Sequence, residues 1–119
     1  MIIDVMDRDE FKLRMITDDK DPDKIHVYNP AGVYDPIMIY VSKDAVNYDI
    51  NVTDMLNFME TRCIPHDQDG VDWWLRKVYK LKFYNPVAIC KQTHGTRMND
   101  FYWVKFDNED IKFDNVRVR

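Results

Sequence analysis

Residues 101–106, Phe-Tyr-Trp-Val-Lys-Phe, are the stretch that decides the fold, because they place a strand near the end of the sequence. Successive side chains of a strand point to opposite faces of a sheet, so both faces of this strand carry aromatic residues. One face must cover the core, while the other is either buried by helices or presented outward. We therefore expect this strand to complete a sheet that earlier residues build.

The first half of the sequence supplies the other strands. Residues 11–15 and 24–28 alternate apolar and polar side chains, which is the pattern of a half-buried strand. Residues 2–6 are a short apolar segment, and residues 37–41 form a continuous apolar run that fits a central strand. Turn-forming residues separate these runs, including Asn-Pro-Ala-Gly at 29–32. The pattern predicts a small antiparallel sheet.

The second half of the sequence predicts three helices. Asn51, Asp69 and Asn85 can cap them, because short polar side chains accept hydrogen bonds from the first N–H groups of a helix. Pro86 follows the third cap, and Gly95 lies just past the end of that helix. The apolar stripes expected to be buried are Val52, Met55, Leu56, Met59 and Cys63 on the first helix and Val71, Trp74, Leu75 and Val78 on the second. Phe58 lies off its stripe. We expect an α+β fold, in which a small antiparallel sheet from the first half and the C-terminal strand packs against about three helices.

Length and composition predict one folded domain, residues 1–119. The chain is 45% hydrophobic and 13% aromatic, which argues against disorder. Its net charge of −4 provides no excess of cations for nucleic-acid phosphates, so we expect no direct nucleic-acid binding. Residues 1–23 hold eight acids against four bases, whereas residues 62–82 hold five bases against three acids. The acidic stretch forms either a solvated face or an imitation of nucleic acid.

The sequence predicts a cytoplasmic protein. No apolar run approaches the ~20 residues that cross a bilayer, and the amino terminus lacks the regions of a secretory signal. We therefore expect no membrane contact and two cysteines that stay reduced.

Catalytic and metal-binding patterns are sparse. The three glycines lie far apart, so neither a phosphate-binding loop nor a dinucleotide fingerprint is possible, and we expect no ATP site. One set of residues has the spacing of a tetrahedral zinc site: Cys63, His66, Cys90 and His94. A buried thiol beside a capped histidine explains the same pattern. We expect no metal, no cofactor and no catalytic residue, and a zinc-dependent or thiol-based enzyme stays an alternative.

Aromatic residues predict a binding surface. Trp73 lies about 100° from Trp74 around its helix, so both cannot occupy the centre of one buried stripe. Trp73 either packs under a loop or anchors a partner, since Trp is favoured at interface hot spots. The residues predicted to contact a partner are Trp73, Lys77, Phe101, Trp103 and the tail 115–119, above all Asn115, Val116 and Arg117.

Four segments, in order along the chain, carry a resemblance to a known family. They are Tyr-Asp-Pro-Ile-Met-Ile at 34–39, Asn-Phe-Met-Glu-Thr-Arg-Cys-Ile-Pro at 57–65, Asn-Pro-Val-Ala-Ile-Cys at 85–90 and Asn-Asp-Phe-Tyr-Trp-Val-Lys at 99–105. Together they resemble the amino-terminal module of HipA-like Ser/Thr kinase toxin proteins of the Gram-positive type. In that family a kinase domain follows the last segment, whereas this sequence ends there.

The resemblance implies a stand-alone module without catalysis of its own. Such a module would dock on a separate HipA-like kinase toxin and restrain it, as an antitoxin does. The alternative is a small phage or mobile-element protein that inhibits a host defence nuclease. In that case the acidic amino-terminal stretch would imitate nucleic acid.

Overall fold

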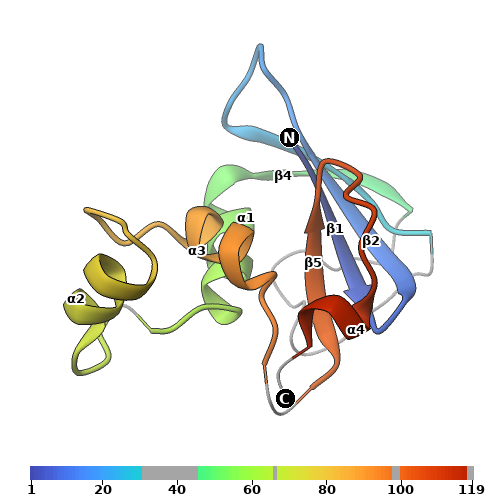
Figure 1. The fold of residues 1–119 in the computed structure, drawn as a ribbon. Helices are drawn as coiled ribbons and strands as arrows, with labels where there is room; N and C mark the ends of the chain where they lie inside the picture. Colours follow the sequence, from blue (N-terminus) through green and yellow to red (C-terminus); the bar gives the residue numbers. More distant parts are fainter. Residues whose placement is uncertain (31–45, 66, 98–99, 118–119) are drawn as a thin grey trace.

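The computed structural model of the chain describes residues 1–30, 46–65, 67–97 and 100–117 (Figure 1). It confirms the α+β class: a five-stranded antiparallel sheet, with strand order β4-β3-β2-β1-β5, packs with short helices. The elements are β1 (Ile2–Asp7), β2 (Glu10–Thr17), β3 (Lys24–Tyr28), β4 (Asn47–Asn51), α1 (Val52–Thr61), α2 (Val71–Trp73), the π-helix η2 (Trp74–Val78), α3 (Pro86–Thr93), β5 (Tyr102–Phe106) and α4 (Phe113–Val116). In these parts of the chain no helix is long and apolar enough to span a membrane.

Three of the four strands predicted in the first half are present, and one unpredicted strand adds to them. β1, β2 and β3 contain the runs 2–6, 11–15 and 24–28, and β5 joins them beside β1 as expected. β4 was not predicted, because it is an edge strand of mostly polar residues in which Ile50 alone is buried. The strand predicted at 37–41 lies outside the described residues.

One face of the sheet forms the core with α1 and α3. Residues paired across neighbouring strands point to the same face of the sheet, as in the pairs Val5–Leu13 and Val5–Val104. The buried side chains of this core include Ile3, Val5, Leu13, Met15, Ile25, Val27, Met55, Phe58, Met59, Ile89, Cys90 and Val104. Phe58 is fully buried, contrary to its predicted position off the stripe. α1 contacts β3, β4 and α3, so more than one narrow stripe of the helix is covered.

The caps of α1 and α3 are confirmed. The Asn51 side chain accepts a hydrogen bond from the Asp54 backbone N–H at 2.8 Å, and Asn85 accepts one from Ala88 at 3.2 Å. Pro86 stands in the first turn of α3, as predicted. The two helices therefore begin where short polar side chains satisfy the first amide groups.

The second helix differs from its prediction. Gly70, in a left-handed conformation, precedes α2 in place of the predicted Asp69 cap. The helix then widens into η2, where the N–H of Tyr79 bonds the carbonyl of Trp74, five residues earlier. A π-turn breaks the 3.6-residue period, so the predicted buried stripe does not form. Trp74 and Val78 are exposed, and Leu75 is buried.

The outer edge of β5 is occupied along its length. Three backbone N–H groups of this strand donate away from β1: Tyr102 to the Asp100 carboxylate (3.1 Å), Val104 to the His94 carbonyl (2.8 Å) and Phe106 to the Glu109 carboxylate (2.8 Å). The segments on both sides of β5 and the end of α3 thus cover this edge.

A projecting segment, defined here as residues 67–84, lies on the far side of α1 and α3 from the sheet. Figure 1 shows α2 (yellow) standing away from the body of the molecule, beyond the two helices. Because it extends from the core, its side chains are offered to solvent on several sides.

Candidate functional site

The projecting segment gathers exposed apolar side chains. In the described part of the chain seven large hydrophobic side chains are exposed, and four of them lie here: Trp73, Trp74, Val78 and Phe83. Trp73 is 57% exposed and Phe83 is 80% exposed. The two Trp rings meet edge to face, with centroids 5.5 Å apart. Apolar groups gathered in this way mark surfaces that bind other molecules.

Cations surround these apolar groups. Residues 73–84 contain four bases and no acid, although the whole chain carries a net charge of −4. Arg76, Lys77, Lys80 and Lys82 are all exposed, and three of them line a shallow hollow of about 470 Å³ together with Leu81. We call this set the basic–aromatic surface: Trp73, Trp74, Arg76, Lys77, Val78, Lys80, Lys82 and Phe83.

Apolar contacts and hydrogen bonds attach the projecting segment to the body: Leu75 is part of the hydrophobic core, and Val71, Tyr79, Leu81 and Tyr84 pack against that core. The Tyr84 hydroxyl donates to the Ile64 carbonyl at 2.7 Å, which joins the chain entering the segment to the chain leaving it. Gln92 on α3 donates from its side-chain amide to the Tyr79 carbonyl at 2.8 Å. Burial raises the pKa of the Tyr84 phenol well above its ordinary value, so the hydroxyl stays a donor. These contacts set the position of the basic–aromatic surface.

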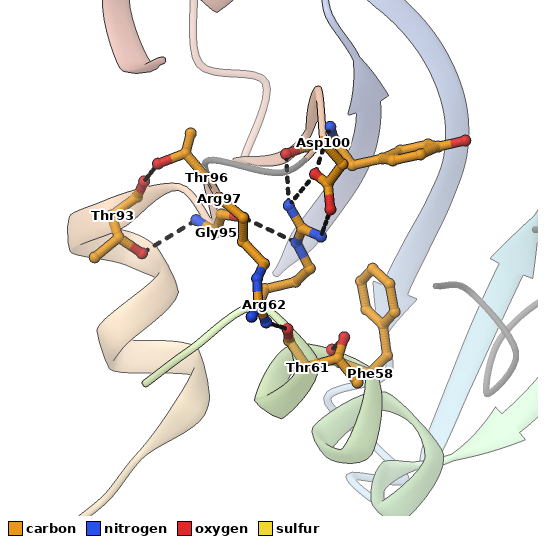
Figure 2. Close-up of polar contacts among 9 residues, drawn as sticks. Phe58, Thr61, Arg62, Thr93, Gly95, Thr96, Arg97 and Asp100 are labelled. Carbon is orange, nitrogen blue, oxygen red and sulfur yellow. Dashed lines mark hydrogen bonds and ion pairs between the residues drawn. The ribbon is translucent and has the colours of Figure 1, made fainter. Parts of the chain in front are cut away.

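Arg62 forms a clamp of buried hydrogen bonds between three parts of the chain (Figure 2). Its guanidinium donates to the Gly95 carbonyl at 2.8 Å, to both Asp100 carboxylate oxygens at 2.9 and 2.8 Å, and to the Tyr102 carbonyl at 2.8 Å. The residue is only 4% exposed. Arg62 therefore joins the end of α1, the end of α3 and the start of β5 through one buried cation.

Gly95 fits this clamp because it has no side chain. Its φ is +63°, and an added Cβ would stand 3.1 Å from the Arg62 Cβ. We expect Gly95→Ala to lower the free energy of unfolding by about 2 kcal/mol. The loss has two causes, the backbone strain of an alanine in the left-handed conformation and the crowding of its Cβ against Arg62. Chemical denaturation measures the loss.

Gly70→Ala is the matched control for that substitution. Gly70 also has a left-handed φ, +79°, but an added Cβ would meet nothing within 4 Å. It should therefore show the backbone strain alone, roughly 1 kcal/mol. Equal losses for the two variants would contradict the proposed crowding at Arg62.

The Arg62–Asp100 pair also predicts a dependence of stability on pH. Burial alone would raise the pKa of Asp100, but the hydrogen bonds and charge of Arg62 outweigh it and hold that pKa below its ordinary value of 3.8. A lowered carboxyl pKa contributes stability above the unfolded-state value, and that contribution is lost as the pH falls through the folded-state value. We expect the free energy of unfolding to fall between about pH 5 and about pH 2, and less steeply in Asp100→Asn. Denaturation curves across this range measure both slopes, and parallel slopes would contradict the prediction.

The predicted contact residues fall on two separate faces. Trp73 and Lys77 are exposed on the projecting segment, as expected for partner contacts. Phe101 is 49% exposed, lies under the Arg8 guanidinium at 4.0 Å and meets the ring of Phe113 edge-on. The tail residues Asn115, Val116 and Arg117 lie in or just after α4. Figure 1 shows α2 and α4 well apart, so the structure does not bring these two groups together.

Trp103 is a correction. Its side chain is fully buried, and its indole N–H donates to the Arg8 carbonyl. A buried ring with a satisfied donor has no surface to offer a partner, so Trp103 belongs to the interior. The sequence indicated aromatic residues on both faces of β5. It did not indicate that the face carrying Trp103 would also be covered.

Of the four residues with zinc spacing, the three that the structure describes do not converge. The Cys63 and Cys90 sulfurs are 3.4 Å apart, whereas the His94 ring lies 3.2 Å from both carboxylate oxygens of Glu109. His66 lies outside the described residues. In the described ranges no three His, Cys, Asp or Glu side chains gather in a way that could hold a metal ion.

The acidic amino-terminal stretch is not one continuous face. Asp4 is buried and accepts two hydrogen bonds from Arg14, at 2.7 and 3.1 Å. Asp21 and Asp23 are exposed and share a surface hollow with Asp49 and Asp54. The acids of this hollow therefore come from the turn before β3, from β4 and from α1.

Sequence reasoning missed Trp74, Val78 and Phe83 as surface residues. Trp74 and Val78 were assigned to a buried stripe because a regular helical period was assumed. The run Lys-Leu-Lys-Phe at 80–83 held the available signal, since lysine is almost never fully buried and two lysines therefore place this run at the surface.

Comparison with known proteins identifies no relative: no protein-family model matches the chain, and neither the curated proteins nor the solved structures include a match.

Proposed function

We propose that this chain is a non-enzymatic, cytoplasmic protein-binding module that docks on a separate HipA-like kinase and restrains it. The observation that carries the proposal is the basic–aromatic surface, with Trp73 57% exposed among four cations. Exposed Trp and Arg side chains are the residues most often found at energetic centres of protein interfaces.

The charge of the surface favours an acidic partner. Residues 73–84 carry four bases and no acid, so an acidic groove or helix would be attracted to them and oriented by them. The mechanism would be steric, with the module occupying the place that the fused amino-terminal module takes in full-length relatives of the family that the sequence resembles.

Two of the segments on which the resemblance rests also contact each other. Segments 57–65 and 99–105, which carry part of it, meet in space through the bonds from Arg62 to Asp100 and Tyr102. Arg62 and Asp100, one from each segment, therefore stabilise the same contact.

A binding and activity experiment tests the proposal. The tagged chain is mixed with the purified HipA-like kinase encoded in the same genome, and complex formation is measured by titration calorimetry. Autophosphorylation of the kinase and its toxicity on co-expression are measured in parallel. The proposal expects a stable complex and a loss of both activities, whereas no complex and unchanged toxicity would reject it.

The second candidate function is inhibition of a defence nuclease. Four acids around one hollow favour it, the exposed Asp21, Asp23 and Asp49 and the half-buried Asp54, because spaced carboxylates can imitate phosphates. Asp21→Asn with Asp23→Asn should then relieve inhibition of the nuclease, while Trp73→Ala should not. The reverse result would place the contact with the nuclease on the basic–aromatic surface instead.

A further inference from the structure

Two cysteines that are far apart in the sequence lie together beneath the projecting segment. Cys63 follows α1 and Cys90 lies on α3, and their sulfurs are 3.4 Å apart. Both thiols also lie near the Met59 carbonyl, at 3.2 and 3.6 Å. A disulfide requires sulfurs at about 2.05 Å, so a small approach of two side chains that already touch would permit a bond.

The two thiols differ in access. Cys90 is fully buried, whereas Cys63 is 7% exposed and lines a pocket of about 440 Å³ with Ile64, Gln68 and Arg97. The hydrogen bond with Cys63, together with burial, raises the pKa of the Cys90 thiol above its ordinary value. A small oxidant that enters this pocket therefore meets Cys63 first.

We propose that Cys63 and Cys90 are a site of reversible oxidation, at which a peroxide joins them in an intramolecular disulfide that ties the two ends of the projecting segment. This proposal does not rest on the proposed function. Its basis is the contact of the two sulfurs across the base of the projecting segment.

The reaction balances in two steps. The Cys63 sulfur attacks one peroxide oxygen, the O–O bond breaks, and one water leaves with the thiol proton, giving Cys63 sulfenic acid. The Cys90 sulfur then attacks the Cys63 sulfur, the S–O bond breaks, and a second water leaves with the Cys90 proton. The two thiols lose two electrons in total, and hydrogen peroxide is reduced to two waters.

The test treats the reduced, full-length chain with hydrogen peroxide and maps its peptides after trypsin digestion without reductant. The expected product joins peptide 63–76 to peptide 83–91 with the loss of two hydrogen atoms, and thiol reagents separate them. Linked peptides are used because the seven methionines also take up oxygen. We also expect the thermal midpoint to rise by roughly 10 °C on oxidation, because the bond closes a loop in the unfolded chain.

Two single variants give the order of reaction. Cys90→Ser should stop at the first step, so that dimedone labels Cys63, whereas Cys63→Ser should leave Cys90 unmodified. Cys90→Ala replaces Cys90→Ser if the serine variant does not fold. The proposal would be overturned if the peptides of the native chain stay unlinked or are linked only between two chains. Equal dimedone labelling of the two variants, or a lowered thermal midpoint, would also overturn it.

Discussion

Replacing Arg62 with alanine should lower the free energy of unfolding by about 3 kcal/mol or more, the cost of removing one partner from a buried ion pair. The change removes four hydrogen bonds, to the Gly95 and Tyr102 carbonyls and to both oxygens of Asp100. It leaves a carboxylate that is only 21% exposed without its cation. Urea denaturation of the variant and the parent protein measures the loss.

Three further variants make that result specific. Arg97→Ala is the matched control, because Arg97 is exposed and its one described bond goes to the Thr61 carbonyl; it should cost less than about 0.5 kcal/mol. Arg62→Lys should be intermediate, since an ammonium keeps the charge but not the paired geometry. Adding Asp100→Asn to Arg62→Ala should cost little more. Additive losses in that double variant would contradict the coupled pair.

Trp73→Ala should reduce the affinity for the proposed kinase partner by roughly thirtyfold, as truncation of a hot-spot residue costs about 2 kcal/mol. The folded state should be almost unchanged, because the ring is 57% exposed and its one described ring contact is with Trp74. Calorimetric titration measures the affinity, and urea denaturation measures the stability. A loss of binding without a loss of stability would locate the contact on the projecting segment.

Phe101→Ala is the matched aromatic control for Trp73→Ala. Phe101 is similarly exposed, at 49%, but it lies beside α4 on the other face. It should leave the affinity within about twofold, which is less than 0.5 kcal/mol. If Phe101→Ala weakens binding and Trp73→Ala does not, the partner binds the α4 face and the proposed contact surface is wrong.

The fold was largely predictable from local patterns, and the contact surface only in part. Alternation marked two strands, a short apolar segment marked β1, and the caps Asn51 and Asn85 marked two helices, because these signals depend on neighbouring residues. The burial of Trp103 depends on Arg8, which is distant in sequence, so no local pattern could indicate it. The exposure of Trp74 depends on the π-turn, which a regular helical period cannot reveal.

The clamp at Arg62 was also beyond local reasoning. Arg62, Gly95 and Asp100 were each part of a quoted motif or a helix end, but their contacts span 33 to 38 residues. Only the three-dimensional arrangement joins them. The same holds for the two cysteines, whose spacing suggested metal ligands while the structure pairs them with each other.

The occupied edge of β5 has a consequence for self-association. A strand whose outward amide hydrogens are free acts as a template on which another chain can polymerise, and many proteins aggregate by that route. Here Asp100, His94 and Glu109 already take the three outward hydrogens of β5. Growth of fibrils or donation of a foreign strand is therefore blocked along this side of the sheet, and a ligand approaching it must be recognised by side chains.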